Sequence, residues 1–236
     1  MRLAVFFTPP RDHPLSIAAA DWLGRDAFTG ESRERAPVAG FETAEIDALT
    51  ADPRRYGFHA TLKPPFRIAE GHTADDVREA LAGFCAGRPA IRIPALELTA
   101  LGPFFALTIG GETGEVDALA ADVVRAFEPF RAPASEAEIA RRRPDALSES
   151  QRANLADWGY PYVFSDFQFH MTLTGRVPPE RRAAMATVLR QRFASFIDQP
   201  LAIDALSLFR EPSPPSDFVV DCQQALPPLA HSVEQV

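Results

Sequence analysis

The chain has 236 residues, a formal net charge of −8 and only 2 cysteines. Its hydrophobic content of 46% is typical of a globular protein that buries a sizeable core, and no apolar run approaches the ~18 residues that span a bilayer. The acidic balance disfavours long nucleic acid, which needs a track of cations, and two cysteines are too few for a disulfide framework or a zinc knuckle.

The apolar stretch within residues 1–9 predicts a first β-strand. It is shorter than the core of a signal peptide, and no small-residue cleavage site follows it. We therefore expect a cytoplasmic protein with no membrane partner.

Helix and strand signals then alternate through the first half of the chain. The spacing of apolar residues, the N-cap residues and the terminating Gly or Pro residues predict helices over 14–23, 43–51, 74–86 and 116–127. The second of these should stop before Pro53, because proline interrupts a helix. Strands are expected around 56–66, 91–98 and 104–109. Residues 25–40 are typical of an irregular, charged loop.

The second half continues in the same style. Capping boxes at 135–138 and 148–151 predict two helices, and the prolines at 178–179 begin a third. Strands are expected around 166–176, 201–209 and 218–222, the last two as a closing hairpin. We predict a single domain over residues 1–226 and a disordered tail over 227–236.

Two short segments of the chain repeat one motif. Phe58-His59-Ala60-Thr61-Leu62 and Phe169-His170-Met171-Thr172-Leu173 share the frame Phe-His-x-Thr-Leu, with their histidines 111 residues apart. The whole chain has only 5 histidines, so chance accounts poorly for the matched pair.

The spacing inside the motif indicates a shared polar face. In a β-strand residues i and i+2 point the same way, so each segment presents a His and a Thr with apolar residues on the reverse. If the two strands meet, His59, Thr61, His170 and Thr172 surround one small volume. Imidazole titrates near neutral pH, so the pair can supply a general base and a general acid to a phosphate ester. The alternative is an ordinary strand whose polar face meets water.

Five further residues are candidate substrate contacts. Strand alternation places Lys63 beyond Thr61, and Thr174 and Arg176 beyond Thr172, where they suit a bound anion. Tyr56 precedes the first motif and Tyr162 the second, and either could donate to phosphate or stack on a ring. The alternatives are solvent-facing charges and ordinary packing.

The histidines do not resemble metal ligands. Neither motif has a second His, Cys or carboxylate at ligand spacing, and Asp166 lies four residues before His170, too far along a strand to share an ion easily. We therefore predict chemistry that needs no metal and no other cofactor.

Bringing the two motifs together requires a cleft. The economical architecture is a two-lobed α+β fold, with two antiparallel sheets flanked by helices around a central cleft.

The motif pair resembles the 2H phosphoesterase superfamily, which is defined by paired His-x-Ser/Thr-hydrophobic motifs. The longer segments 54–66 and 169–176 resemble a narrower subgroup, DUF1045, often encoded beside bacterial phosphonate-breakdown genes. The resemblance implies a bilobal fold and metal-independent cleavage of cyclic phosphodiesters. It also implies that His59 and His170 are the acid–base pair and that Thr61 and Thr172 hold phosphate oxygens. Which histidine is the base is left open.

Three functions are therefore in competition. The favoured one is opening of a cyclic phosphate on a small ribose-based metabolite of phosphonate breakdown. The second is RNA end processing at 2′,3′-cyclic phosphates or 2′–5′ linkages, which predicts strongly salt-dependent binding. The third is a nucleotide-binding module without turnover, which could have used Arg or Lys in place of the histidines.

Overall fold

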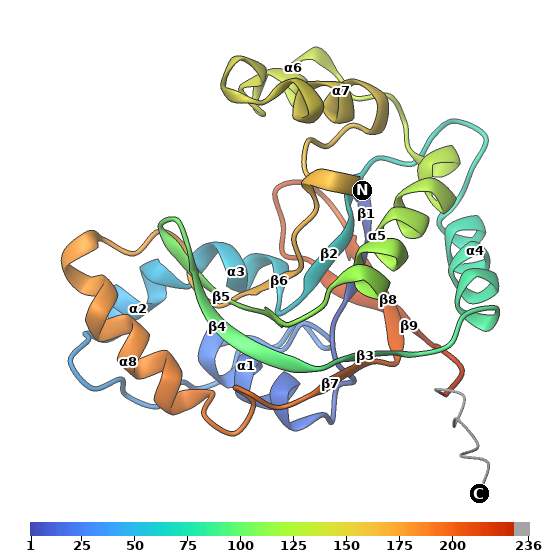
Figure 1. Ribbon diagram of the computed structural model, residues 1–236. Helices are drawn as coiled ribbons and strands as arrows, with labels where there is room; N and C mark the ends of the chain where they lie inside the picture. Colours follow the sequence, from blue (N-terminus) through green and yellow to red (C-terminus); the bar gives the residue numbers. More distant parts are fainter. Residues whose placement is uncertain (229–236) are drawn as a thin grey trace, which may run out of the picture.

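The computed structural model of the chain describes residues 1–228 (Figure 1). Its helices are α1 (Pro14–Leu23), α2 (Thr43–Leu49), α3 (Ala51–Tyr56), α4 (Ala74–Ala86), α5 (Gly114–Ala126), α6 (Glu136–Ala140), α7 (Glu149–Trp158) and α8 (Arg182–Arg192). Its strands are β1 (Arg2–Phe7), β2 (Ala60–Phe66), β3 (Ile91–Ile93), β4 (Ala95–Leu101), β5 (Phe104–Gly110), β6 (His170–Thr172), β7 (Leu201–Ile203), β8 (Ala205–Glu211) and β9 (Val219–Ala225).

Local signals fix where several helices begin. The hydroxyls of Thr73, Ser135 and Ser148 each accept from the backbone three residues on, and the residue there reaches back to the cap. These capping boxes start α4, α6 and α7, as predicted. Two helices end at a glycine in the left-handed region, α1 at Gly24 and α7 at Gly159.

Seven strands form one antiparallel sheet in the order β4-β5-β6-β2-β1-β8-β9, and β3 pairs with β7 in a small second sheet. The predicted α+β class, with antiparallel sheets and flanking helices, is confirmed. One detail differs from the expectation, because both motif strands are neighbours within the large sheet. They join a three-stranded part to a four-stranded part through a single registered pair, Ala60 and Met171.

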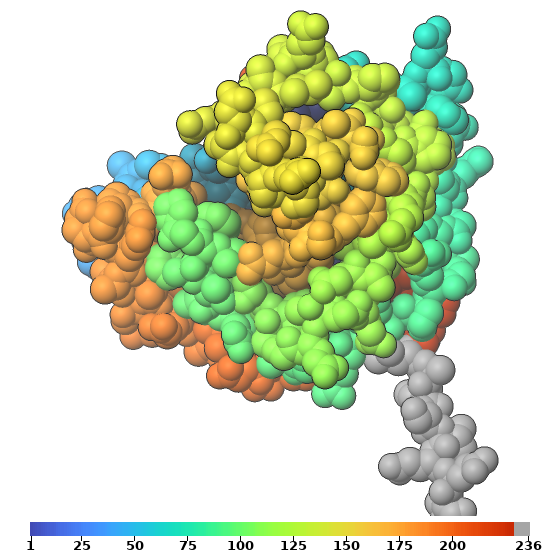
Figure 2. All heavy atoms as spheres, turned by 45° about the horizontal axis from the view of Figure 1, so that its top comes forward, coloured from blue at the N-terminus to red at the C-terminus, as the bar shows by residue number. Residues whose placement is uncertain are grey.

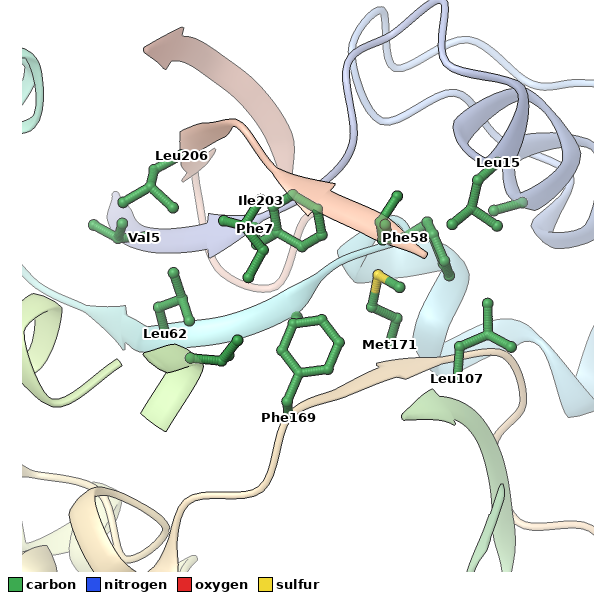
Figure 3. Close-up of a cluster of buried hydrophobic side chains, with 14 of the residues drawn as sticks. Val5, Phe7, Leu15, Phe58, Leu62, Leu107, Phe169, Met171, Ile203 and Leu206 are labelled. Atoms are coloured by element: carbon green, nitrogen blue, oxygen red, sulfur yellow. The ribbon is translucent and has the colours of Figure 1, made fainter. Parts of the chain in front are cut away.

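The reverse side of the motif strands lies in the main core (Figure 3). Apolar residues of both motifs are buried there, as the alternation predicts: Phe58, Ala60, Leu62, Phe169, Met171 and Leu173. Helices α1, α4, α5 and α8 contribute to the same cluster, so they cover this face of the sheet. On the other side, Thr61 and His170 line a cavity together with Tyr160 and Tyr162, which follow α7. Helices α6 and α7 form an arm that stands apart from the helices of the core (Figure 1).

Two predicted elements are divided in the structure. The helix expected over 43–51 ends at Leu49, and a second helix, α3, contains Pro53 in its first turn. The prediction that Pro53 stops a helix is wrong, because N–H groups of a first turn have no intrahelical partner and proline loses nothing there. The strand expected over 91–98 is interrupted at Pro94, between β3 and β4.

The predicted tail, residues 227–236, lies almost entirely outside the described residues. The loop expected over 25–40 contains no helix or strand. None of the helices in residues 1–228 combines the length and apolarity needed to cross a membrane.

Candidate functional site

His59 stands at the junction between α3 and β2. The helix ends at Gly57, whose φ of 78° favours glycine, and the carbonyl oxygen of Gly57 lies 2.9 Å from Nδ1 of His59. A carbonyl only accepts, so Nδ1 carries the proton. In the neutral ring, Nε2 is then the acceptor for the Thr61 hydroxyl, 3.1 Å away. The basic nitrogen therefore faces the polar side of the strand.

His170 repeats this arrangement in the second motif. Its Nδ1 lies 2.8 Å from the carbonyl oxygen of Gln168, again two residues earlier, so Nδ1 is the donor and Nε2 is left for chemistry. Both imidazoles are thus held in the same tautomer by their own strands.

The sheet register brings the two motifs together. Ala60 pairs with Met171 in antiparallel register. One residue further each way, His59 lies across from Thr172 and Thr61 across from His170. The two histidines are therefore diagonal to each other across the strand pair. Residues in diagonal positions are roughly 7–8 Å apart, and one phosphate group can span that separation. All four predicted catalytic residues therefore share one patch of the sheet.

Aromatic rings surround His59. Its imidazole stacks on Phe6, with ring centroids 3.8 Å apart and planes at 20°. The rings of Tyr56 and Phe209 lie farther away, each with its centroid 6.0 Å from the centroid of the imidazole. Burial lowers the pKa of His59 to about 4; the hydrogen bond to Gly57 opposes this shift, and the charge of His170 adds to it. At neutral pH His59 is a proton acceptor.

A cavity of about 410 Å³ opens beside His170. Thr61, His170 and Tyr162 all line it, and Tyr162 is 46% exposed. Its other ring-bearing walls are Phe104, Tyr160 and Phe167. A cavity walled by rings, with polar groups at one end, fits a sugar or a base attached to a phosphate.

Two of the five predicted substrate contacts lie at this site. Tyr162 faces the cavity, and Tyr56 lies beside His59 and stacks on Phe218 with ring centroids 4.9 Å apart. Their contact with substrate stays a prediction.

Lys63 does not lie with them. Its side chain is completely buried, forms an ion pair with Glu128 and donates to the carbonyl oxygen of Val124 at 3.2 Å. The cause is an irregularity in β2, because one step along β1, from Val5 to Phe6, takes two residues on β2, from Lys63 to Thr61. Such a β-bulge breaks the alternation on which the prediction rested. Lys63 is therefore removed from the substrate-binding set.

Thr174 also lies away from the site, and Arg176 does not line the cavity beside His170. Strand β6 ends at Thr172, so alternation no longer governs the residues that follow. Thr174 is completely buried, and its hydroxyl accepts from the Phe105 N–H at 3.0 Å. Arg176 is exposed and does not line the cavity beside His170. The contact predicted for Thr174 is therefore wrong, and the contact predicted for Arg176 stays a prediction.

Two residues at the site had no clear signal in the sequence. Phe6 is distant from both motifs in the sequence, and it reaches His59 only because β1 pairs with β2. Thr108 pairs with His170 across β5 and β6, which no local pattern indicates. Among residues 1–228 there is no group of three or more His, Cys, Asp or Glu side chains arranged to hold a metal ion.

Residues 61–219 match a protein family described as "Protein of unknown function (DUF1045)". The matched segment contains Thr61 and the whole second motif, and His59 lies just before it.

Two curated relatives are named ribose 1,5-bisphosphate phosphokinase PhnN. The one from Janthinobacterium sp. (strain Marseille) is 39% identical over 222 residues, which are 92% of this chain and 49% of that protein. The one from Laribacter hongkongensis (strain HLHK9) is 32% identical over 226 residues, 92% of this chain and 50% of that protein. The chain thus spans about half the length of the curated relatives that it matches.

Solved structures give weaker likenesses. E. coli LigT complexed with 3′-AMP aligns with a TM-score of 0.41 and 13% identity, covering 96% of this chain and 98% of that one. The protein TT0787 of Thermus thermophilus aligns with a TM-score of 0.45 and 15% identity over the same shares.

Proposed function

The chain is a member of the DUF1045 family, and we propose that it is a phosphoesterase of the 2H type. In this proposal it hydrolyses a cyclic phosphodiester on a small ribose-based metabolite of phosphonate breakdown. The observation that carries the proposal is the diagonal array in which His59 faces Thr172 and Thr61 faces His170 across one strand pair. Two imidazoles and two hydroxyls around one point are the groups that phosphate-ester hydrolysis needs when no metal takes part.

The two histidines would take different roles. Because burial keeps His59 neutral, we assign it as the general base, and His170, protonated at the start of the cycle, as the general acid. Nε2 of His59 takes a proton from water as the water oxygen bonds to phosphorus. The bond from phosphorus to the ribose oxygen breaks, and Nε2 of His170 gives its proton to that oxygen.

The threonine hydroxyls would hold the phosphate. Thr61 donates to Nε2 of His59 at 3.1 Å. With a phosphate in place, the same hydroxyl can turn to a non-bridging oxygen and free Nε2 for the water. Thr172, across from His59, is placed to serve the opposite oxygen. Hydrogen-bond donors that are already in place where negative charge develops in the transition state lower the activation barrier most.

The ribose part of the proposal is supported by the relatives. They are named for a kinase of a ribose bisphosphate, and this chain spans about half of each. Lys63 is the chain's only lysine, and it follows Leu62. The chain therefore has no Gly-Lys-Ser/Thr segment of a phosphate-binding loop. We assign to it a second reaction on related ribose phosphates, separate from the kinase step.

A direct activity screen tests the proposal. Chelator-treated protein would be offered ribose 1,2- and 2,3-cyclic phosphates, nucleoside 2′,3′-cyclic phosphates and oligonucleotides with cyclic ends. We expect turnover of the small substrates in the presence of chelator. Saturable binding without product across this panel would favour the non-catalytic module, and turnover of the oligonucleotides alone would favour RNA end processing.

A further inference from the structure

A second cavity, of about 770 Å³, lies between the strand ends of β1 and β2 and the arm of α6 and α7. We call it the arginine groove, because six arginines line it: Arg2, Arg55, Arg67, Arg131, Arg141 and Arg142. In Figure 2 the arm, coloured yellow, comes forward from the rest of the molecule. A groove with this lining is unexpected on a chain whose net charge is −8.

Acidic partners neutralise only part of this charge. Glu211 contacts both Arg2 and Arg55, and the pairs Arg67–Glu138 and Arg131–Glu128 account for the other two carboxylates. Glu128 also pairs with Lys63, so six arginines and three carboxylates leave at least three positive charges in excess. A concave surface with a local excess of one sign attracts a small ion of the other sign, whatever the net charge of the molecule.

Arg141 and Arg142 are the free cations of the groove. Neither makes an ion pair within residues 1–228, and both are exposed. Arg142 instead lies over the ring of Tyr160, with its guanidinium carbon 4.8 Å from the ring centroid. These two guanidinium groups can therefore bind a ligand without first breaking an ion pair.

The groove adjoins the catalytic patch on two sides. Tyr56 lines the groove, and its ring centroid lies 6.0 Å from that of His59. Arg142 covers Tyr160, which lines the cavity beside His170. A molecule whose phosphate lies between the two histidines can therefore extend past Tyr56 or Tyr160 and reach the guanidinium groups.

We propose that the arginine groove binds a second phosphate of the substrate. The substrate class is then a small cyclic phosphodiester that carries at least one further phosphate group on its sugar. This inference rests on the proposed function and narrows it. Arginine suits the task because its planar fork binds phosphate oxygens in pairs.

The charge of the groove favours a small molecule over RNA. Proteins that hold long nucleic acid contact about 6–10 phosphates along a continuous track. Three excess charges in one groove match one or two phosphate groups. The rest of the acidic surface would repel a longer polyanion.

A matched pair of substrates tests the proposal. Adenosine 2′,3′-cyclic phosphate would be compared with its 5′-phosphorylated form, and the ratio of their kcat/KM values measured. We expect the wild type to prefer the 5′-phosphorylated form, and Arg141→Ala/Arg142→Ala to lower this preference by at least about tenfold. Arg92→Ala/Arg190→Ala is the control, since it removes two exposed arginines that line neither cavity and changes the net charge equally. A preference that is the same in all three proteins would overturn the inference.

A binding measurement separates this inference from the proposed function. Inorganic pyrophosphate would be titrated calorimetrically into His59→Ala/His170→Ala, which lacks the catalytic imidazoles, and into the same protein carrying Arg141→Ala/Arg142→Ala. Binding that is retained in the first and lost in the second supports the groove, even if no substrate is turned over. Equal binding by both would refute it. Tighter and steeply salt-dependent binding of an oligonucleotide, lost with the same arginines, would replace the small phosphate with RNA.

Discussion

The imidazole of His59 stacks on the ring of Phe6, with centroids 3.8 Å apart and planes at 20°. This contact removes water from one side of the imidazole, and burial lowers the pKa of His59 to about 4. A base that stays neutral well below pH 6 keeps its activity in acid. We expect the acidic limb of a plot of kcat/KM against pH to fall near pH 4, in contrast to the pKa of about 6.5 of an exposed histidine.

The variant Phe6→Ala tests whether the stacked ring causes the low pKa of His59. Removing the stacked ring lets water reach His59, so the pKa of His59 rises and the acidic limb moves to higher pH. A wild-type limb near pH 6.5, or a limb that does not move in Phe6→Ala, would contradict the assignment of His59 as the base.

The same pKa makes folding depend on pH. Between pH 6.5 and pH 4 the unfolded chain binds a proton at His59 that the folded chain does not bind, so the free energy of unfolding falls as the pH falls. We expect this residue to account for a loss of about 1–3 kcal/mol across that range. Urea unfolding at several pH values would measure it, and in His59→Gln this part of the loss should disappear.

Replacing either histidine of the proposed acid–base pair should reduce turnover sharply. His59→Gln and His170→Gln each remove a proton-transfer group and should lower kcat by about 10²–10⁴-fold. His72→Gln is the control, because His72 is exposed and lies at neither motif. Wild-type turnover in both catalytic variants would end the acid–base proposal.

Sequence periodicity predicts where the candidate site residues lie only as far as the strand is regular. The alternation that places His59 and Thr61 on one face holds up to Thr61, and then the bulge sends Lys63 to α5. In the second motif it holds to Thr172, where β6 ends. Neither a bulge nor the end of a three-residue strand has a signal in one short segment, because both depend on the neighbouring strands.

Contacts between distant segments explain what else could not be predicted. The capping boxes at Thr73, Ser135 and Ser148 are local, so their helices could be predicted. The pairing of Ala60 with Met171 is not local, and neither is the gathering of arginines from distant parts of the chain into one groove. The pairing of the two motif strands could be predicted because the repeated motif itself implied that one long-range contact.

Loss of a threonine hydroxyl should affect the chemical step. Thr61→Val and Thr172→Val keep the shape of the side chain but remove a donor to the phosphate oxygens, so we expect kcat to fall by about 10²-fold. Thr174→Val is the comparison, because its hydroxyl accepts from Phe105 in the core. That variant should lose stability with kcat retained. Equal kcat values in all three variants would remove the threonines from the mechanism.

Lys63 and Glu128 should matter for stability alone. Glu128→Gln leaves the completely buried ammonium of Lys63 without its opposite charge and should cost about 3 kcal/mol, whereas Lys63→Met removes the buried charge and should cost less. Arg131 remains to pair with Glu128 in Lys63→Met. Urea unfolding shows which of the two variants loses more stability. In steady-state kinetics, Lys63→Met should keep the KM of the wild type. A raised KM would return Lys63 to the substrate-binding set.

Gly57 should be the position where the backbone itself sets the catalytic geometry. Its φ is 78°, a Cβ there would come within 2.4 Å of the Ala27 Cβ, and its carbonyl holds Nδ1 of His59. Gly57→Ala should therefore cost more than the ~1–3 kcal/mol of an unfavourable φ and should also lower kcat by displacing the imidazole. Gly40→Ala is the matched control, since Gly40 has the same φ of 78° with nothing within 4 Å of the added Cβ. Urea unfolding and kcat measured on both variants separate the cost of the backbone angle from that of the clash. If the two variants lose the same stability and keep the same kcat, the carbonyl of Gly57 does not position His59.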